Sequence, residues 1–204
     1  SPGAYHPEVI ERDLIQMKGL GINLVSIQMG GLRQIPNLRD FMRRCAAHGL
    51  KVNGFLLGAN PTDFDERLAT NLICESRLAD DPTLFAYDIS WEAGNHVFHP
   101  KNRKRWDGDW NRWIRERYGS ADAARRDWQY AALEGGETVR SPQDRELTEM
   151  GDWQVYTAAY RRFMDDLTSR LWNNAHRILK RVDSNHLISF RQGNTLPYDF
   201  GLTG

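Results

Sequence analysis

The sequence lacks net charge, long hydrophobic runs and cysteine pairs. Its 204 residues carry 27 basic and 27 acidic side chains, so the formal net charge is zero. Proteins that bind nucleic acid through the phosphate backbone carry a basic stripe, and we therefore expect no nucleic-acid partner. The two cysteines, Cys45 and Cys74, fall in helix-like segments without metal or redox spacing, so we expect two buried free thiols and no cofactor.

No apolar run approaches the roughly 20 residues of a membrane-spanning helix, so we expect no membrane partner. The sequence shows no signal peptide, and it begins with Ser-Pro-Gly in place of a starting methionine. We interpret the two ends as processing or cloning boundaries. The sequence indicates no particular compartment.

Helical and strand patterns alternate along the first half of the chain. The helical stretches place apolar residues three and four positions apart, whereas the strand stretches are short and rich in β-branched residues. The predicted helices are 7–18, 37–48 and 62–79, the last capped by Thr62, and the predicted strands are 22–29, 51–57 and 84–92. This alternation is typical of parallel βαβ units and predicts an α/β fold.

A long stretch separates the strand that ends at Glu92 from the next predicted strand, 187–192. Loops between a strand and its following helix usually span about 2 to 6 residues, so we interpret residues 95–150 as a helical insertion. Short helices are predicted over 109–118 and 120–128, and Ser120 is a natural cap for the second. Three tryptophans of the insertion have helical spacing, which favours a packed face over a sugar platform: Trp106, Trp110 and Trp113.

Four strands and four helices are too few for a closed (β/α)₈ barrel, which typically has about 250 residues. We interpret 1–204 as a single partial (β/α)₈ TIM barrel domain, with a helix over 151–181 packing on its outside; the alternative is a small doubly wound sheet. A half-barrel exposes its sheet edges and its interior. We therefore expect either a second copy or a missing carboxyl-terminal half as the partner.

Glu92 is the most informative single position, because it ends a strand and is followed at once by Ala-Gly-Asn. Barrel enzymes keep their catalytic groups at the carboxyl ends of their strands. Alternation assigns one set of side chains to the helix-covered face, namely Phe85, Tyr87, Ile89 and Trp91. It assigns Asp88 to the same face as Glu92 but too far down the strand to be its catalytic partner, so Asp88 is expected in a polar core layer. The alternative for Glu92 is a strand end that points into water.

Three stretches resemble retaining glycoside hydrolases of the large TIM-barrel clan, in particular the β-galactosidase-like and cellulase-like families. Residues 11–25 are similar to the first helix and second strand of those barrels, and residues 81–92 are similar to their fourth strand. Residues 113–120, followed by Trp128, resemble the segment after that strand in the β-galactosidase-like families. The resemblance covers the amino-terminal half of the barrel.

The resemblance implies that the protein hydrolyses a β-linked oligo- or polysaccharide with retention of configuration. It implies that Glu92 is the general acid/base and that the nucleophilic glutamate lies on the seventh strand, beyond Gly204. Two positions depart from the family pattern, because Trp91 stands where an asparagine is usual and Ser26 where an arginine is common.

A carbohydrate site needs flat apolar surfaces and hydroxyl partners. The candidates at the predicted strand ends are Trp91, Asn95, Asn60, Gln28 and Gln192. For each of the amides, satisfying the backbone of its own loop is the alternative role.

Two other classes of function remain open. One is a non-catalytic carbohydrate-binding or structural barrel fragment, which the departure at Trp91 permits. The other is a metal-dependent sugar isomerase-type barrel that uses Glu92 with His96 or His99. Because no helical pair or cysteine cluster supports a metal there, we predict no metal site.

Overall fold

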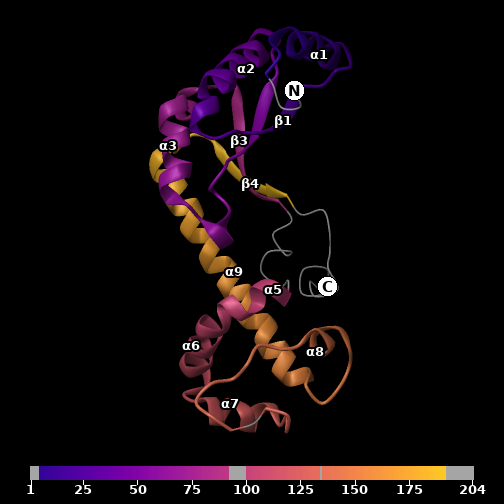
Figure 1. The fold of residues 1–204 in the computed structure, drawn as a ribbon, viewed down its shortest axis with the longest axis vertical. Coiled ribbons are helices and arrows are strands. Elements are labelled where there is room, and N and C mark those ends of the chain that lie inside the picture. Colours follow the sequence, from indigo (N-terminus) through magenta and orange to yellow (C-terminus); the bar gives the residue numbers. More distant parts are fainter. Residues whose placement is uncertain (1–4, 92–99, 134, 192–204) are drawn as a thin grey trace. The chain divides into compact units, whose positions relative to one another are not determined.

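The structure is a computed structural model that describes residues 5–91, 100–133 and 135–191 (Figure 1). The longer elements are α1 (Pro7–Gly19), β1 (Leu24–Gln28), α2 (Ile35–Ala47), β2 (Lys51–Phe55), α3 (Glu66–Ser76), β3 (Leu84–Trp91), α6 (Asp107–Tyr118), α7 (Ala121–Trp128), α9 (Gln154–Val182) and β4 (Leu187–Arg191). Two shorter helices are α5 (Pro100–Arg103) and α8 (Asp144–Thr148). Single 3₁₀ turns are η1 (Leu32–Gln34), η2 (Pro61–Asp63), η3 (Leu78–Asp80) and η4 (Lys104–Trp106).

The four strands in the described ranges form one parallel sheet in the order β1-β2-β3-β4. Each strand pairs with the next one along the chain, and a helix connects every pair. This is the arrangement of consecutive β/α units in part of a (β/α)₈ barrel. The predicted α/β fold class is confirmed.

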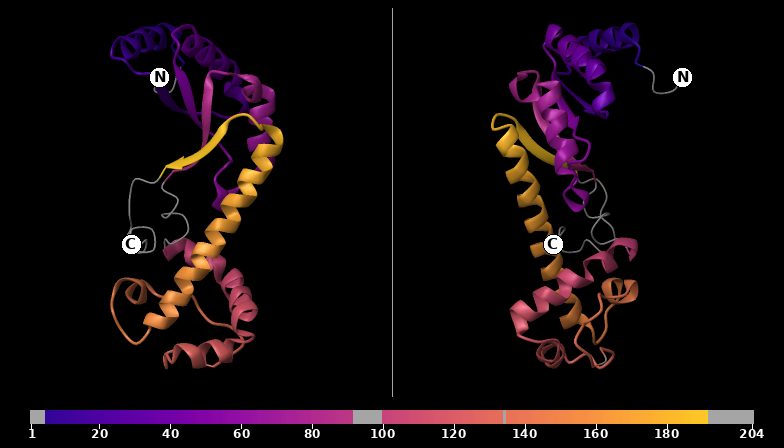
Figure 2. Two further views of the ribbon diagram at one scale, coloured as in Figure 1. Left: turned by 180° about the vertical axis from the view of Figure 1, so that it is seen from behind. Right: turned by 60° about the vertical axis from the view of Figure 1, so that its left-hand side comes forward.

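The residues fall into two compact units, the first formed by 5–91 with 172–191 and the second by 100–133 with 135–171. In the first unit, α1, α2, α3 and the end of α9 cover one face of the sheet (Figures 1 and 2). The apolar stripe of α2 supplies the buried residues Leu38, Met42 and Cys45 to this core. They pack with strand residues such as Val52, which is fully buried.

The prediction of which side chains of the strand 84–92 lie on the helix-covered face is wrong at both ends of the strand. Tyr87 and Ile89 are buried in the helix-covered core as expected, but Phe85 is 48% exposed and Trp91 is 56% exposed. The register of β3 shifts once against β2, between Val52 and Asn53, and once against β4, between Asp88 and Trp91. A bulge places an extra residue in one strand, so simple alternation fails on either side of it.

The predicted cap of the third helix is also wrong. Thr62 lies in η2, and α3 begins at Glu66, where the Asp65 carboxylate accepts from the backbone N–H of Leu68 at 2.9 Å. The helix ends at Ser76 because Arg77 takes the left-handed conformation, with φ of 58°. Both cysteines were expected to be buried, and this is wrong for Cys74, which is exposed. Cys45 is buried, and burial raises the pKa of its thiol to about 12.

Gly58 shapes the loop that follows β2. Its φ of +80° is in the left-handed region, and a Cβ at this position would lie 3.2 Å from three side-chain carbons of Leu68. Its carbonyl oxygen accepts from the backbone N–H of Asp65 at 2.8 Å, which ties the loop to the start of α3.

We predict that Gly58→Ala lowers the free energy of unfolding by about 1 to 2 kcal/mol, the cost of a left-handed non-glycine residue. Equilibrium unfolding in urea measures the change. Gly31→Ala is the matched control, because Gly31 has φ of −71° and open space around it. Equal stability of the two variants would contradict the prediction.

The second unit has its own aromatic core. Trp110 and Trp128 are almost completely buried, with ring centroids 5.7 Å apart, and Tyr156, Tyr160 and Phe163 of α9 surround them. Trp106 is 9% exposed and Trp113 is partly buried against the same core. The helical spacing of these tryptophans therefore serves packing, as predicted.

The long helix does not pack only on the outside of the sheet. Ala175 and Leu179 belong to the core of the first unit, whereas the residues from Tyr156 to Leu167 on its buried face belong to the core of the second. The second unit as described extends through Leu171. Ser120 caps α7 as predicted, since its hydroxyl accepts from the N–H of Ala123 at 3.1 Å.

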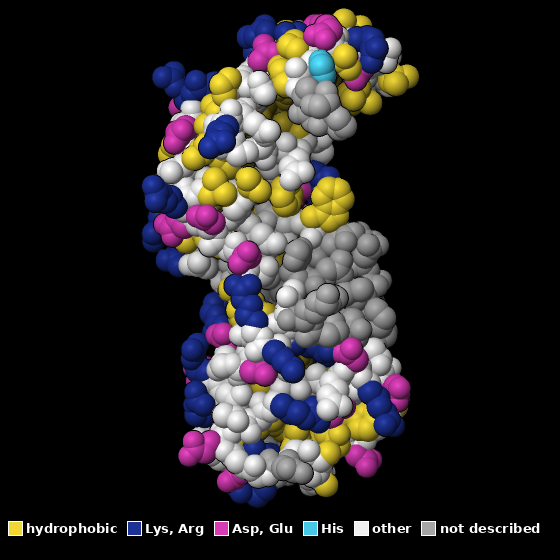
Figure 3. Space-filling view, in the orientation of Figure 1, with side chains coloured by type: hydrophobic (Ala, Val, Ile, Leu, Met, Phe, Trp, Pro, Cys, Tyr) yellow, Lys and Arg dark blue, Asp and Glu magenta, His cyan; other side chains and the backbone are white. Residues whose placement is uncertain are grey.

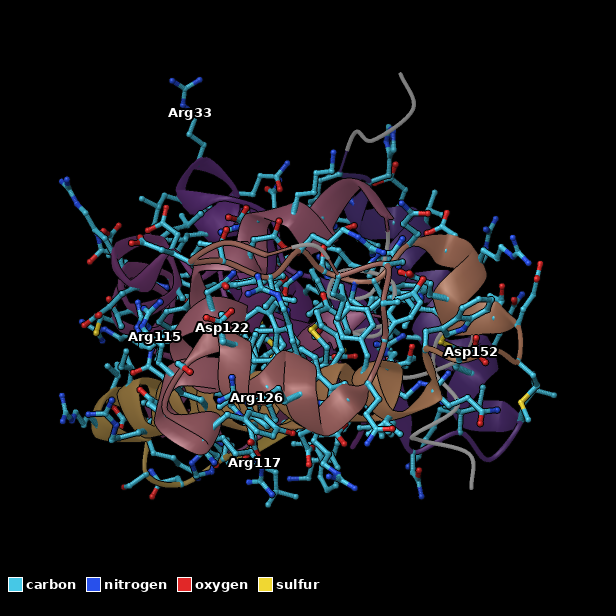
Figure 4. The ribbon with its side chains drawn as sticks, turned by 90° about the horizontal axis from the view of Figure 1, so that it is seen from below. Arg33, Arg115, Arg117, Asp122, Arg126 and Asp152 are labelled. Carbon is cyan, nitrogen blue, oxygen red and sulfur yellow. The ribbon has the colours of Figure 1, made fainter. Side chains whose placement is uncertain are left out.

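On the surface, basic and acidic side chains are interspersed (Figure 3). Six charged residues are labelled in Figure 4, among which Arg33 extends well away from the ribbon. Within the described ranges, no helix combines the length and the apolar character needed to cross a membrane.

Candidate active site

The structure describes three of the six predicted site residues. Trp91 lies at the end of β3, Gln28 at the end of β1, and Asn60 in the segment after β2. The other three, Glu92, Asn95 and Gln192, lie outside the described residues, as do His96 and His99 of the metal alternative.

Trp91 pairs with Arg191, the last residue of β4. The guanidinium carbon of Arg191 lies 5.3 Å from the centroid of the Trp91 ring, within the range of a cation–π contact. In sequence, Glu92 and Gln192 are the residues that directly follow this pair. In sequence, each of the two predicted polar residues therefore comes directly after the last residue of one of two neighbouring strands.

Arg191 also forms an ion pair with Asp88, because its Nε donates to Asp88 Oδ2. Asp88 has no exposed surface, in agreement with the polar core layer expected for it. Among the described residues, Oδ1 of Asp88 has no hydrogen-bond partner. Sequence reasoning missed Arg191, although a cation that ends an otherwise apolar strand is a usable signal.

Two further polar atoms are buried near Asp88 without a hydrogen-bond partner in the part of the chain that is described, namely Asn53 Oδ1 and Ser90 Oγ. Asn53 is on β2, where its Nδ2 lies 3.5 Å from Ser26 Oγ, and Ser90 is next to Trp91 on β3. Buried polar atoms almost always find a partner, so these atoms indicate a face that requires additional polar groups or water.

Asn60 is engaged with its own loop. Its Oδ1 accepts from the backbone N–H of Thr62 at 3.1 Å and from the Thr62 hydroxyl at 3.0 Å. This arrangement caps η2 and matches the alternative role considered for the amide. These two hydrogen bonds engage only the Oδ1 atom of Asn60, so its Nδ2 group is the one that could donate a hydrogen bond to a sugar hydroxyl.

Gln28 lines a pocket of about 350 Å³ at the edge of the sheet. The pocket lies between α1, the end of β1 and α2, with Tyr5, Met29 and Phe41 among its walls. β2 separates β1 from β3, and the register places Gln28 level with Asp88, three residues before Trp91. Gln28 and Trp91 are therefore two strand spacings apart across the sheet, about 10 Å, and about another 10 Å apart along the strands. The pocket therefore belongs to the edge strand and not to the end of β3.

In chemical terms, the described part of the site has three groups at the end of the β3–β4 pair. They are the exposed indole of Trp91, the buried carboxylate of Asp88 and the guanidinium of Arg191. The flat face of the Trp91 indole suits a sugar ring. The next residue in the sequence, Glu92, has a carboxyl group. Within the described ranges, no group of three or more His, Cys, Asp or Glu side chains could hold a metal ion.

A comparison with protein-family models matches residues 63–199, more than half of the chain, to glycoside hydrolase family 42, which is described as beta-galactosidase. The matched range contains β3, the whole second unit as described, and β4. A search of curated proteins found no match. The parallel sheet with connecting helices and the family match agree, and the chain belongs to glycoside hydrolase family 42 as part of a (β/α)₈ barrel.

Proposed function

We propose that the protein hydrolyses a β-linked oligo- or polysaccharide with retention of configuration and that Glu92 is its general acid/base. The observation that carries the proposal is the position of Glu92, directly after the last residue of β3 in a chain matched to a glycoside hydrolase family. Barrel enzymes place catalytic carboxylates at this end of their strands.

In the first chemical step, Glu92 donates its proton to the glycosidic oxygen, and a second carboxylate attacks the anomeric carbon. We assign that second carboxylate to a later strand of the barrel, outside residues 1–204. In the second step, Glu92 takes a proton from water, which then displaces the carboxylate. For the first step, the pKa of Glu92 must lie above its ordinary value, which the negative charge of the second carboxylate would favour.

We propose that Trp91 is a stacking surface for a sugar ring, because it is 56% exposed at the end of β3. Asn95, Gln192 and the Nδ2 group of Asn60 are the proposed hydroxyl contacts. Gln28 lies on β1, two strands away from Trp91 on β3. We therefore propose that Gln28 contacts only those sugar units of a long substrate that lie far from the Trp91 ring.

We propose that the uncovered face of the sheet is closed by further barrel strands, which belong either to the same polypeptide or to a second copy. The support is its exposed apolar side chains, Leu24, Phe85 and Leu187, which are 39%, 48% and 56% exposed. Polar groups of the same closing segment, or water, would then serve the buried atoms Asn53 Oδ1, Asp88 Oδ1 and Ser90 Oγ.

The experiment that tests the function is the hydrolysis of a panel of aryl β-glycosides by the longest polypeptide that contains this chain, with the product followed by proton NMR. We expect a β-galactoside to be turned over and the β-anomer to appear first, before mutarotation. First appearance of the α-anomer would contradict retention. Binding of a sugar without turnover would instead identify a non-catalytic carbohydrate-binding barrel.

A further inference from the structure

We infer that the pocket between α1, the end of β1 and α2 is a second sugar-binding site, which takes one neutral pyranose unit at a distance from Trp91. Its volume of about 350 Å³ and its combination of apolar walls with a few polar groups are typical of ligand sites. The inference deepens the proposed function, because the choice of a sugar as the ligand rests on it. None of the residues that line the pocket takes part in the proposed chemical steps.

The lining of the pocket is uncharged. Charged side chains make up 26% of the sequence, yet within the described part of the chain no lining residue is an aspartate, a glutamate, a lysine or an arginine. Three lining residues are exposed amides, namely Gln28, Gln34 and Asn37. An amide both donates and accepts hydrogen bonds, and so does a hydroxyl group. The lining therefore favours a neutral ligand rich in hydroxyls over an ionic one.

The apolar part of the lining suits the face of a pyranose ring. It consists of side chains from three elements, with Val9 and Ile10 on α1, Ile27 and Met29 at the end of β1, and Phe41 on α2. The helices α1 and α2 lie side by side next to β1 (Figure 1). A pyranose presents C–H groups on its faces and hydroxyls around its edge, so it matches apolar walls combined with amides.

Two glycines make room for side chains of the lining. A Cβ on Gly30 would lie 1.4 Å from the Oε1 atom of Gln34, so the Gln34 amide lies directly against the Gly30 backbone. A Cβ on Gly54, inside β2, would lie 1.8 Å from the terminal methyl carbon of Met29. Glycine inside a strand weakens it and marks a close approach. Neither glycine has φ in the left-handed region, so it is the space for Gln34 and Met29 that requires glycine at these positions.

Hydrogen bonds between the segment before α1, α1 and α2 hold the wall formed by Tyr5. The Tyr5 hydroxyl donates to Asp40 Oδ2 at 2.6 Å, and the Nε of Arg44 donates to the same oxygen at 2.7 Å. The Nη1 of Arg44 donates to Glu11 Oε2 at 2.6 Å, which joins α2 to α1. Because these walls are ordered before a ligand arrives, binding costs less conformational entropy. The arrangement is that of a preformed site.

The test uses the longest polypeptide that contains this chain, with its methionine methyl groups labelled with carbon-13 for NMR. Met29 belongs to the lining, so its methyl resonance, assigned with Met29→Leu, reports an occupied pocket. We expect galactose to shift this resonance saturably and to leave that of Met150, in the second unit, unchanged. A β-linked galactotriose, added to the Glu92→Gln form to prevent hydrolysis, shows whether the pocket takes a unit of a longer chain or only the free sugar.

Substitutions locate the ligand within the pocket. Gln34→Ala should raise the Kd for galactose about 3- to 10-fold, the effect of about one lost hydrogen bond. Gly30→Ala should have the same effect because its Cβ would displace the Gln34 amide, and the double variant should bind no more weakly than Gln34→Ala alone. Gly31→Ala is the matched control, since a Cβ there would meet open space. No Met29 shift with either sugar, or equal Kd values in wild type and all variants, would overturn the inference.

Hydrolysis of 2,4-dinitrophenyl β-galactoside, measured in parallel, separates this inference from the proposed function. If wild type hydrolyses this substrate and Met29 responds to neither sugar, the inference about the pocket alone is wrong. If Met29 responds and wild type hydrolyses no aryl β-galactoside, the proposed function alone is wrong and the sugar site stands.

Discussion

Replacing Glu92 by Gln is expected to lower kcat/KM for phenyl β-galactoside by about 10²- to 10⁴-fold, the usual contribution of a general acid. Phenolate is a poor leaving group and needs the proton that Glu92 would donate. Dinitrophenolate departs without a proton, so kcat/KM for the dinitrophenyl substrate should stay within about tenfold of wild type. Steady-state kinetics on both substrates measures the difference.

Azide provides an independent readout in the same variant. Without a general base, water attacks the glycosyl-enzyme slowly, whereas azide is a nucleophile that needs no deprotonation. Adding azide to Glu92→Gln with the dinitrophenyl substrate should raise kcat and yield the β-glycosyl azide. Glu116→Gln is the control, since Glu116 is exposed on α6. Absence of any azide product would count against an acid/base role.

Asp183→Ala is expected to lower the free energy of unfolding of the first unit by about 3 to 5 kcal/mol, the cost of removing one partner from a buried charged network. Asp183 is 2% exposed. Its Oδ2 lies 2.7 Å from both the Tyr87 hydroxyl and the Nδ1 of His186. Its Oδ1 accepts from the backbone N–H groups of Asn185 and His186 at 2.8 and 3.1 Å.

Urea unfolding followed by circular dichroism measures this cost. Tyr87→Phe removes one hydrogen bond to the carboxylate and should cost about 1.5 to 3 kcal/mol. Asp152→Ala is the matched control, because Asp152 is exposed (Figure 4), and it should change stability by less than about 0.5 kcal/mol. If Asp183→Ala is no less stable than this control, the network does not stabilise the fold.

The same network predicts the direction of a pH effect. Burial raises the pKa of Asp183, but hydrogen bonds from Tyr87, His186 and the backbone outweigh it, and the net pKa is lowered. A carboxyl with a lowered folded pKa stabilises the protein above its unfolded pKa of about 3.9, and this stability is lost as the pH falls through the folded pKa. The loss of stability below about pH 4 should therefore be shallower in Asp183→Asn, as measured by urea midpoints at a series of pH values. An unchanged slope would assign the acid sensitivity to other groups.

Much of the local structure could be predicted because its causes are local. The periodicity of apolar residues placed α2 and α6 within two residues of their observed limits, and the Ser120 cap lies next to the N–H group that it satisfies. The tryptophan spacing at Trp106, Trp110 and Trp113 identified a packed face for the same reason. The strand pattern also identified Glu92 at a strand end, and the resemblance to a family then implied its role as general acid/base.

The errors share a different origin. Phe85 and Trp91 are exposed because register shifts against two neighbouring strands break the alternation, and a register depends on strands far apart in the chain. The Asp88–Arg191 pair joins residues separated by 103 positions, so no local pattern announces it. The division of α9 between two cores likewise depends on what packs against each half of its stripe.

The sequence by itself determined the alternation of strands and helices, the formal net charge of zero and the position of Glu92 at a strand end, because these follow from side-chain type and short-range spacing. Only the tertiary structure decided that Arg191 contacts both Asp88 and Trp91 and that Gln28 lines a pocket two strands away. Each of these outcomes requires distant segments to meet in one register, and that register is set by the packing of the whole sheet.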